Sequence, residues 1–336
     1  MKKVFSLLMI AATMLACNGK DGEAPSQGEV ITNVKTFNKV KVAFGDGYSQ
    51  SADGTFTFPE NLDNVKQIKM YLQDFCPNYE CDEWDRYANI YAKDKATGEW
   101  YEIGRFINPY WVGTEKLERG LEFDVTDFKS LLTGETELRI YTETWLSKGR
   151  TYSVEFDFVH GTPDYKYSTV VPVLQYNQSS QHGVPYGEEH EFDLDKTINV
   201  PANADVAYLR TIISGWGHAL PGNCAEWCVR THNVIMDGEL FPHVLKGLGC
   251  RNNPIDNQDP PNGNSAWKPD RAGWCPGMIV PVRFDNIEKT KFGSNINFEY
   301  RFADYTNNMS RGRAFYAIST FVVVKSNQPI QKANVN

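Results

Sequence analysis

Two short segments of the sequence combine carboxylates, a tryptophan and an arginine close to a cysteine. The first is Cys-Asp-Glu-Trp-Asp-Arg at residues 81–86, and the second is Cys-Ala-Glu-Trp-Cys-Val-Arg at residues 224–230. Carboxylates transfer protons, a tryptophan ring can stack on the apolar face of a sugar, and arginine can bind an oxyanion. These residue types together predict a rigid, carbohydrate-facing acid–base site.

Two further segments place a carboxylate near a tryptophan. They are Tyr-Thr-Glu-Thr-Trp at 141–145 and Asp-Arg-Ala-Gly-Trp at 270–274. If residues 141–145 form a strand, alternation puts Glu143 and Trp145 on one face. A single such pair is more typical of a surface ion pair beside a core tryptophan, but four of them favour a site. Aromatic residues make up 13% of the chain, which suits a sugar-binding or sugar-cleaving protein.

The motifs of several common enzyme classes are absent from the sequence. It contains no Gly-x-Ser-x-Gly, no His-Glu-x-x-His, no phosphate loop and no dinucleotide-binding glycines. The histidines are dispersed, at His160, His182, His190, His218, His232 and His243. A net charge of −8 without a basic stripe argues against nucleic acid as a partner.

The N-terminus has the pattern of an export signal. Lys2 and Lys3 precede an apolar run over residues 4–16, which is too short to span a bilayer, and Cys17 follows. We therefore predict a lipoprotein-type signal peptide at 1–16, lipidation of Cys17 and a flexible polar tether at 17–33. The expected location is the outer membrane or cell surface, and otherwise the periplasm or the medium. Ordinary secretion with cleavage nearby is the alternative.

Six cysteines remain after Cys17, and an even number in an exported chain predicts three disulfides. Their clustering favours the local pairs Cys76–Cys81, Cys224–Cys228 and Cys250–Cys275. Zinc binding by the short cysteine spacings is the alternative. The third pair would close a long loop at 251–270 that is rich in Asn, Pro, Asp and Gly, and such loops are usually functional or disordered.

Apolar and polar residues alternate with period two over much of the chain. The runs at 138–142, 152–158 and 296–302 are examples, and turn signals separate them. One short segment, 126–132, has helical periodicity over about two turns. The pattern predicts an all-β fold, a sandwich or jelly roll, with domains at 34–162 and 163–336.

The chain resembles the bacterial peptide-N-glycosidase F family from about Val34 to Pro329. The segments that carry the resemblance are Cys-Asp-Glu-Trp-Asp-Arg-Tyr-Ala-Asn (81–89), Gly-Arg-Phe-Ile-Asn-Pro-Tyr-Trp-Val-Gly (104–113), Tyr-Thr-Glu-Thr-Trp-Leu (141–146), Ile-Ser-Gly-Trp-Gly-His (213–218), Cys-Ala-Glu-Trp-Cys (224–228) and Asp-Arg-Ala-Gly-Trp-Cys-Pro-Gly (270–277). The resemblance implies two eight-stranded jelly-roll domains packed side by side. It also implies an amidase that cuts between asparagine and the innermost N-acetylglucosamine of an N-glycan, leaving aspartate and a glycosylamine.

The resemblance assigns roles to individual residues. The principal catalytic aspartate falls on Asp85, with Glu226 and Glu143 as supporting acids. Substrate contacts fall on Arg86, Tyr110, Trp145, Trp216, Arg271 and Trp274. Glu83 is then a structural neighbour. No metal or cofactor is expected, and the partners are N-linked glycopeptides and glycoproteins acted on by a monomer.

The loop at 218–224, which looks short, and the loop at 251–270 depart from the family pattern, and both could change glycan or peptide preference. Two other functions remain open on the same carboxylates and aromatics. One is an endo-acting glycoside hydrolase, and the other is a glycan-binding protein without turnover.

Overall fold

The computed structural model describes residues 29–336, and nearly all of its regular structure is antiparallel β-strand. The strands form four sheets of five, four, six and five strands. The predicted signal peptide, Cys17 and most of the predicted tether lie outside the described residues. Strand β1 (Ile31–Lys35) begins within the range predicted as tether and pairs with β9 (Arg150–His160).

The first half of the chain contributes two sheets. One has the order β1-β9-β4-β7 with β2 paired to β9, and the other has the order β3-β8-β5-β6. Their remaining strands are β2 (Val40–Val42), β3 (Ser51–Thr57), β4 (Val65–Phe75), β5 (Tyr87–Lys93), β6 (Trp100–Ile107), β7 (Leu121–Asp124) and β8 (Glu135–Thr142). The alternation seen in the sequence explains how the sheets face each other. Tyr152, Val154 and Phe156 of β9 are all buried, while Ser153 and Glu155 between them are partly exposed.

The second half contributes the other two sheets. One has the order β10-β19-β13-β14, with β11 and β17 attached, and the other has the order β16-β15-β18-β12-β20. The strands are β10 (Tyr167–Tyr176), β11 (Val184–Pro185), β12 (Leu194–Asn199), β13 (Val206–Leu220), β14 (Cys224–Ala225), β15 (Thr231–Met236), β16 (Glu239–Val244), β17 (Val282–Ile287), β18 (Asn295–Arg301), β19 (Met309–Ser326) and β20 (Asn334–Val335). The run at 296–302 falls in β18, where Ile296, Phe298 and Tyr300 are buried.

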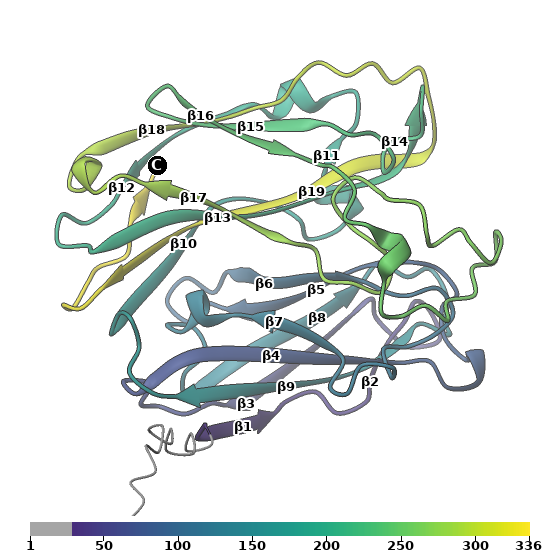
Figure 1. Cartoon of the computed structure of the whole chain (residues 1–336), viewed down its shortest axis with the longest axis horizontal. Coiled ribbons are helices and arrows are strands. Elements are labelled where there is room, and N and C mark those ends of the chain that lie inside the picture. Colours follow the sequence, from purple (N-terminus) through teal and green to yellow (C-terminus); the bar gives the residue numbers. More distant parts are fainter. Residues whose placement is uncertain (1–28) are drawn as a thin grey trace, which may run out of the picture.

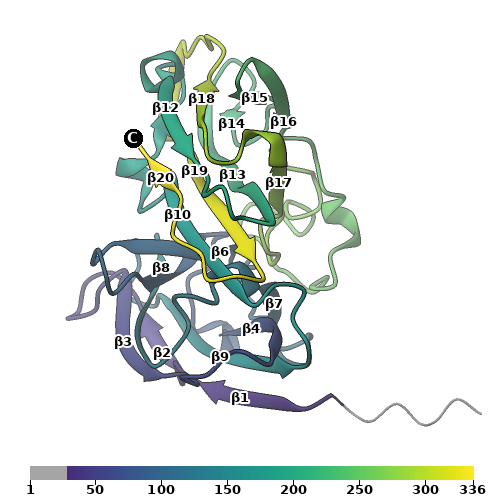
Figure 2. The ribbon, with the colours of Figure 1, turned by 90° about the vertical axis from the view of Figure 1, so that its left-hand side faces the viewer.

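The two halves form two β-sandwiches that lie against each other (Figure 1). Figure 2 shows the same arrangement from the side, with β1–β9 below and β10–β20 above. The all-β class and the pair of jelly rolls are confirmed. The first half has nine strands and the second has eleven, where eight per domain were expected. The additional strands include the short strands β2, β11, β14 and β20. Every described strand pair falls within one half, and this supports the proposal of a domain boundary after residue 162.

A buried ion pair of the first half makes hydrogen bonds to the second half. Glu102 and Arg105 of β6 are fully buried and make a 2.7 Å salt bridge. Arg105 also donates to the Ser214 hydroxyl at 2.9 Å and to the Ala317 carbonyl at 2.6 Å, and Glu102 accepts from the Ser319 hydroxyl at 2.6 Å. These partners lie on β13 and β19, so the two sandwiches together complete the hydrogen bonding of this buried pair.

The helical periodicity at 126–132 does not produce an α-helix. The structure forms only a 3-10 turn at Thr126–Phe128, followed by irregular turns. A segment of this length is too short to stabilise an α-helix alone. Its apolar periodicity has another cause, because Phe128, Leu131 and Leu132 all point into the core of the first sandwich.

The three predicted disulfides are present. They join Cys76 to Cys81, Cys224 to Cys228 and Cys250 to Cys275. All six cysteines are therefore used, and the zinc alternative has no thiolates left to act as ligands. Within residues 29–336, no helix has the length and apolar character needed to cross a bilayer.

We predict that Glu102→Ala lowers the free energy of unfolding by about 3–5 kcal/mol, because it leaves Arg105 buried without its counter-charge. Urea denaturation measures the change. The control is Glu137→Ala, which removes an exposed ion pair with Lys93 and should cost less than about 1 kcal/mol. Equal effects of the two substitutions would contradict the bridging role of Glu102.

Candidate active site

Three loops of the first sandwich meet at one edge of its sheet. Asp85 and Arg86 directly precede β5, Tyr110 follows β6, and Glu143 follows β8. Strand β5 lies between β6 and β8, with Tyr87 opposite Ile107 and Ala88 opposite Thr142. Because neighbouring strands are antiparallel, the start of β5 and the ends of β6 and β8 lie at the same edge, and their loops converge there.

The second sandwich brings four more of the predicted residues to this edge. Trp216 lies on β13, and Glu226 follows β14, which pairs with β13 through His218 and Ala225. Arg271 and Trp274 lie near the end of the long segment closed by the Cys250–Cys275 disulfide. In Figure 1 this segment, in green, lies at the right-hand end of the molecule beside the loops of the lower sandwich.

Arg271 connects the acids from the two halves. Its Nη2 lies 3.5 Å from Oδ2 of Asp85, and its Nε lies 3.6 Å from Oε1 of Glu226. Nη2 also donates to the Tyr110 hydroxyl at 3.0 Å. The Arg271 side chain is 1% exposed, and those of Asp85 and Glu226 are 13% and 12% exposed. One buried cation therefore holds two nearly buried carboxylates.

The same guanidinium anchors the long loop that precedes it. It donates to the carbonyls of Ala266, Trp267 and Pro269 at 2.9, 3.3 and 2.8 Å. Its Cζ lies 4.5 Å from the ring centroid of Trp227, within the range of cation–π attraction. The loop at 251–270 has little regular secondary structure, but hydrogen bonds to Arg271 order its C-terminal part.

Burial and mutual repulsion keep a proton on this pair of acids. Burial raises the pKa of Glu226 to about 8, the negative charge of Asp85 adds to the rise, and Arg271 opposes it. Burial also raises the pKa of Asp85, against the lowering effect of Arg271 and of a hydrogen bond with Tyr110. Two close carboxylates resist simultaneous ionisation, so one proton stays at the site near neutral pH.

A cleft of about 470 Å³ opens beside this pair. It is lined by Asp85, Arg86, Tyr87, Glu143, Trp145, Ser180, Gln181, Trp216, Arg313 and Phe315. Glu143 is buried and accepts a hydrogen bond from the Ser180 amide at 2.8 Å, and burial raises its pKa. Trp145 is 53% exposed and presents its ring to solvent. Strand β8 ends at Thr142, so alternation does not extend to Glu143 and Trp145, yet both line the cleft.

The two predicted tryptophans of the second sandwich form a stack. The rings of Trp216 and Trp274 are 4.3 Å apart and nearly parallel. Trp216 lines the cleft, while Trp274 is 1% exposed and donates its Nε1–H to the Gly215 carbonyl at 2.6 Å. Trp274 therefore supports the face of Trp216 from behind.

Buried polar groups fix the loop that carries Asp85. Asp82 is fully buried and accepts from the Trp84 amide at 3.0 Å, from Arg86 Nε at 2.6 Å and from the Thr144 hydroxyl at 2.5 Å. It thereby joins the Asp85 loop to the Glu143 loop. Glu83 is half-buried and does not line the cleft, consistent with the prediction of a structural neighbour.

Several residues of the site have no signal in the sequence. Ser180, Gln181 and Arg313 line the cleft from segments without any recognisable motif. His218, whose Nε2 lies 3.8 Å from Oε2 of Glu226, and Trp227 stand inside the matched segments and could have been selected from them.

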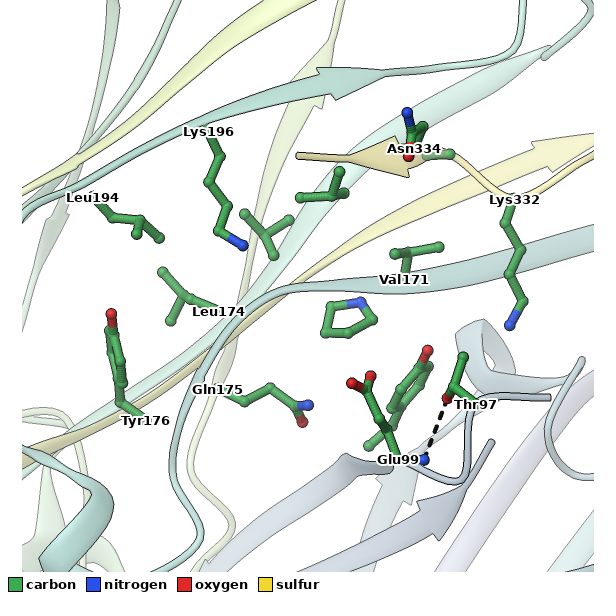
Figure 3. Close-up of a pocket in the computed structure, with 15 residues that line it drawn as sticks. Thr97, Glu99, Val171, Leu174, Gln175, Tyr176, Leu194, Lys196, Lys332 and Asn334 are labelled. Carbon is green, nitrogen blue, oxygen red and sulfur yellow. Dashed lines mark hydrogen bonds between the residues drawn. The ribbon is translucent and has the colours of Figure 1, made fainter. Parts of the chain in front are cut away.

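A second groove of about 610 Å³ lies at the far end of the β5–β6 hairpin (Figure 3). Thr97 and Glu99 line it from the hairpin, and Gln175, Lys196 and residues 332–335 line it from the second sandwich. Glu99 is the single carboxylate among its described lining residues, and no tryptophan lines it. The cleft beside Asp85 is the candidate active site because it combines two acids, Asp85 and Glu143, with tryptophans.

Comparison with known proteins identifies similar chains. Residues 186–323 match the model of the C-terminal part of peptide-N-glycosidase F. A protein of Elizabethkingia miricola, peptide-N(4)-(N-acetyl-beta-D-glucosaminyl)asparagine amidase F, is 58% identical over an alignment of 346 positions, which covers 97% of each chain.

The chain belongs to the peptide-N-glycosidase F family.

Solved structures of this family share the fold. A recombinant peptide:N-glycanase F superposes with a TM-score of 0.87 and 63% identity, covering 91% of this chain and 99% of its own. PNGase F of Flavobacterium meningosepticum, described as a glycosylasparaginase, gives a TM-score of 0.87 and 62% identity over the same shares. A more distant structure, PNGF-II, has 16% identity and a TM-score of 0.68 over 90% of this chain and 66% of its own, and it shares the fold alone.

We predict that the Glu226 carboxyl titrates near pH 8 and that Asp85→Asn lowers its pKa, because the substitution removes the neighbouring negative charge. NMR titration of ¹³C-labelled glutamate carboxyls measures both values, and Glu226→Gln assigns the signal. The matched control is Asp53→Asn, which removes an exposed aspartate paired with Arg139 and should leave the Glu226 titration unchanged. An ordinary glutamate titration, unaffected by Asp85→Asn, would contradict the coupling.

Proposed function

We propose that this protein is an amidase that hydrolyses the bond between asparagine and the innermost N-acetylglucosamine of N-linked glycans. The observation that carries the proposal is the pair of Asp85 and Glu226 on one buried arginine, beside a cleft lined by Glu143 and Trp145. The family relationship supports it, since a relative at 58% identity carries the name of this activity.

The reaction adds water across the side-chain amide of the glycosylated asparagine. A water oxygen bonds to the amide carbon, the carbon–nitrogen bond breaks, and the nitrogen leaves with the sugar as a glycosylamine after gaining a proton. Asparagine becomes aspartate. Such hydrolysis needs a base for water, an acid for the leaving nitrogen and a partner for the oxyanion.

The two coupled acids suit the first two tasks. Burial raises the pKa of Asp85, while Arg271 and the hydrogen bond with Tyr110 oppose the rise, and the negative charge of Asp85 in turn raises the pKa of Glu226. Asp85 is therefore the proposed base that takes a proton from water. Glu226, with a pKa of about 8, stays protonated near neutral pH and is the proposed donor to the leaving nitrogen. Environments that separate the pKa values of two carboxyls commonly assign base and acid in this way.

Arg271 is the proposed partner of the oxyanion. Its Nε–H is buried, and within the described part of the chain it makes no hydrogen bond, with Glu226 Oε1 at 3.6 Å. A buried donor without an acceptor can stabilise charge that develops only in the transition state. Trp274 and Trp227 enclose the guanidinium, at 5.3 and 4.5 Å from their ring centroids, and limit its hydration.

The cleft residues suit the sugar side of the bond. Glu143 can accept hydrogen bonds from the hydroxyl or amide groups of the first sugar. The exposed Trp145 ring offers an apolar face on which the second sugar can stack. Trp216, backed by Trp274, forms another wall, and Arg86 adds donors at the cleft. These assignments call for no cofactor or metal, and we propose that the enzyme acts as a monomer on glycopeptides and glycoproteins.

We further propose that the protein is exported, with Cys17 as a lipid anchor at the outer membrane or cell surface. The pattern of residues 1–17 supports this, and the three disulfides fit an oxidising compartment. Intact-mass analysis of the membrane fraction should find a chain that begins at a lipidated Cys17. An unmodified cysteine there would exclude the anchor.

The proposed reaction predicts a specific product. Incubation with a defined N-glycopeptide should yield a peptide with aspartate at the glycosylated position, measured by mass spectrometry. Asp85→Asn should lower kcat/KM by about 10²–10⁴-fold, because the base is removed while the shape is kept. The matched control is Glu83→Gln in the same segment, which should retain nearly full activity.

Other products would identify the other functions. An asparagine that still bears one N-acetylglucosamine would show cleavage between sugars and contradict the amidase. Glycan binding by the wild type without any product would instead indicate a binding protein.

A further inference from the structure

An exposed aromatic pair lies beside the proposed active site and has no role in the mechanism above. The rings of Tyr79 and Trp111 meet edge to face, with centroids 5.8 Å apart. Trp111 donates its Nε1–H to the Tyr79 carbonyl at 2.9 Å, and Tyr79 is 53% exposed. The pair comes from two loops, one closed by the Cys76–Cys81 disulfide and one that follows β6.

The backbone at this pair adopts conformations that large side chains rarely adopt. The φ angles of Tyr79 and Trp111 are +59° and +52°, and that of Asn78 is +53°. Such a conformation costs on the order of 1 kcal/mol or more for each bulky residue, and it persists only where the surroundings enforce it. The fold therefore maintains this aromatic surface at a cost in stability although it leaves Tyr79 half in water.

A buried arginine supports the Trp111 loop and ties it to the catalytic loop. Arg150 donates to the carbonyls of Pro109 and Val112, at 2.5 and 2.7 Å, on either side of Trp111. It also donates at 3.3 Å to the carbonyl of Trp84, the residue before Asp85. The aromatic pair is thus held in a fixed position relative to the proposed base.

The pair lies outside the glycan cleft, on a loop that also contributes to the site. Tyr110, next to Trp111, carries the hydroxyl that binds Arg271, and its ring lies 6.3 Å from that of Trp84. Neither Tyr79 nor Trp111 lines the cleft that contains Glu143 and Trp145. The loops around Asp85 therefore carry two aromatic surfaces, and the one formed by Tyr79 and Trp111 lies outside the proposed sugar cleft.

We propose that Tyr79 and Trp111 bind the polypeptide that flanks the glycosylated asparagine. The inference rests on the proposed function, which places the sugars in the cleft. The asparagine side chain is short, so the backbone that carries it must pass close to Asp85 on the side that the glycan does not occupy. Rigid aromatic rings bind extended peptide at low entropic cost by packing on its apolar side chains.

The test compares two substrates with the same glycan. One is a single glycosylated asparagine with both ends capped, and the other is a longer glycopeptide with leucines on both sides of that asparagine. Tyr79→Ala should raise the KM of the longer substrate about 3- to 10-fold and leave the capped substrate unchanged. Tyr79→Gly, which suits the left-handed backbone, should show the same loss and thereby exclude strain as the cause.

Two further variants serve as controls. Phe284→Ala removes another exposed ring, on β17 of the second sandwich, and should change neither KM. Trp145→Ala, on the glycan side, should raise the KM of both substrates to a similar extent. If Tyr79→Ala affects both substrates equally, or neither, the peptide-binding role is overturned.

The activity of the wild type distinguishes failure of the proposed amidase function from failure of the peptide-binding role alone. Glycan release from both substrates by the wild type upholds the proposed function, and the Tyr79 comparison then decides the inference. Failure of the wild type to release glycan from either substrate would overturn the proposed function and this inference with it.

Discussion

The guanidinium of Arg271 is the interaction on which the rest of the site depends. A buried arginine is costly unless its charge and its donors are satisfied, and here the partners come from both sandwiches. Asp85 and Tyr110 belong to the first half of the chain, and Glu226 belongs to the second. The loop carbonyls at 266–269 accept hydrogen bonds from Nη1 and Nη2. The same cation thereby orders the long loop, joins the two halves and holds two acids within reach of one another.

The surrounding fold keeps this arrangement in place. Hydrogen bonds that cross the interface from the buried Glu102–Arg105 pair favour one way of docking the two sandwiches. Asp82 and Arg150 make hydrogen bonds to Arg86 and Trp84, the residues on either side of Asp85. Such support matters because a catalytic group displaced by about 1 Å can lose about 100-fold in rate. The disulfides on the flanking loops contribute to the same rigidity.

The sequence predicted the fold class well because half-buried strands require apolar and polar residues to alternate along the chain. The alternation at 152–158 follows from one face of β9 lying in the core. Cysteines close in sequence could be paired for a similar reason, since their spacing limits the partners within reach. The segment at 126–132 misled because apolar spacing reports burial, and burial there is achieved by an irregular turn.

The site itself was harder to predict. Composition pointed to carboxylates and tryptophans, and only the family resemblance distinguished Asp85 from Glu83. Contacts between distant segments leave no local pattern, so the roles of Ser180 and Arg313 at the cleft emerged only from the fold. The hydrogen bonds between Arg271 and residues 266–269 could not be predicted for the same reason, and the sequence alone suggested an unstructured loop.

The central claim is that the buried pair retains one proton near neutral pH and uses it on the leaving nitrogen. The most direct test is the pH dependence of kcat/KM for release of glycan from an N-glycopeptide. Because Glu226 must be protonated to donate, the rate should fall about tenfold per pH unit above about pH 8. Glu226→Gln should lower the rate and abolish this alkaline limb. A limb that persists unchanged in Glu226→Gln would contradict the account.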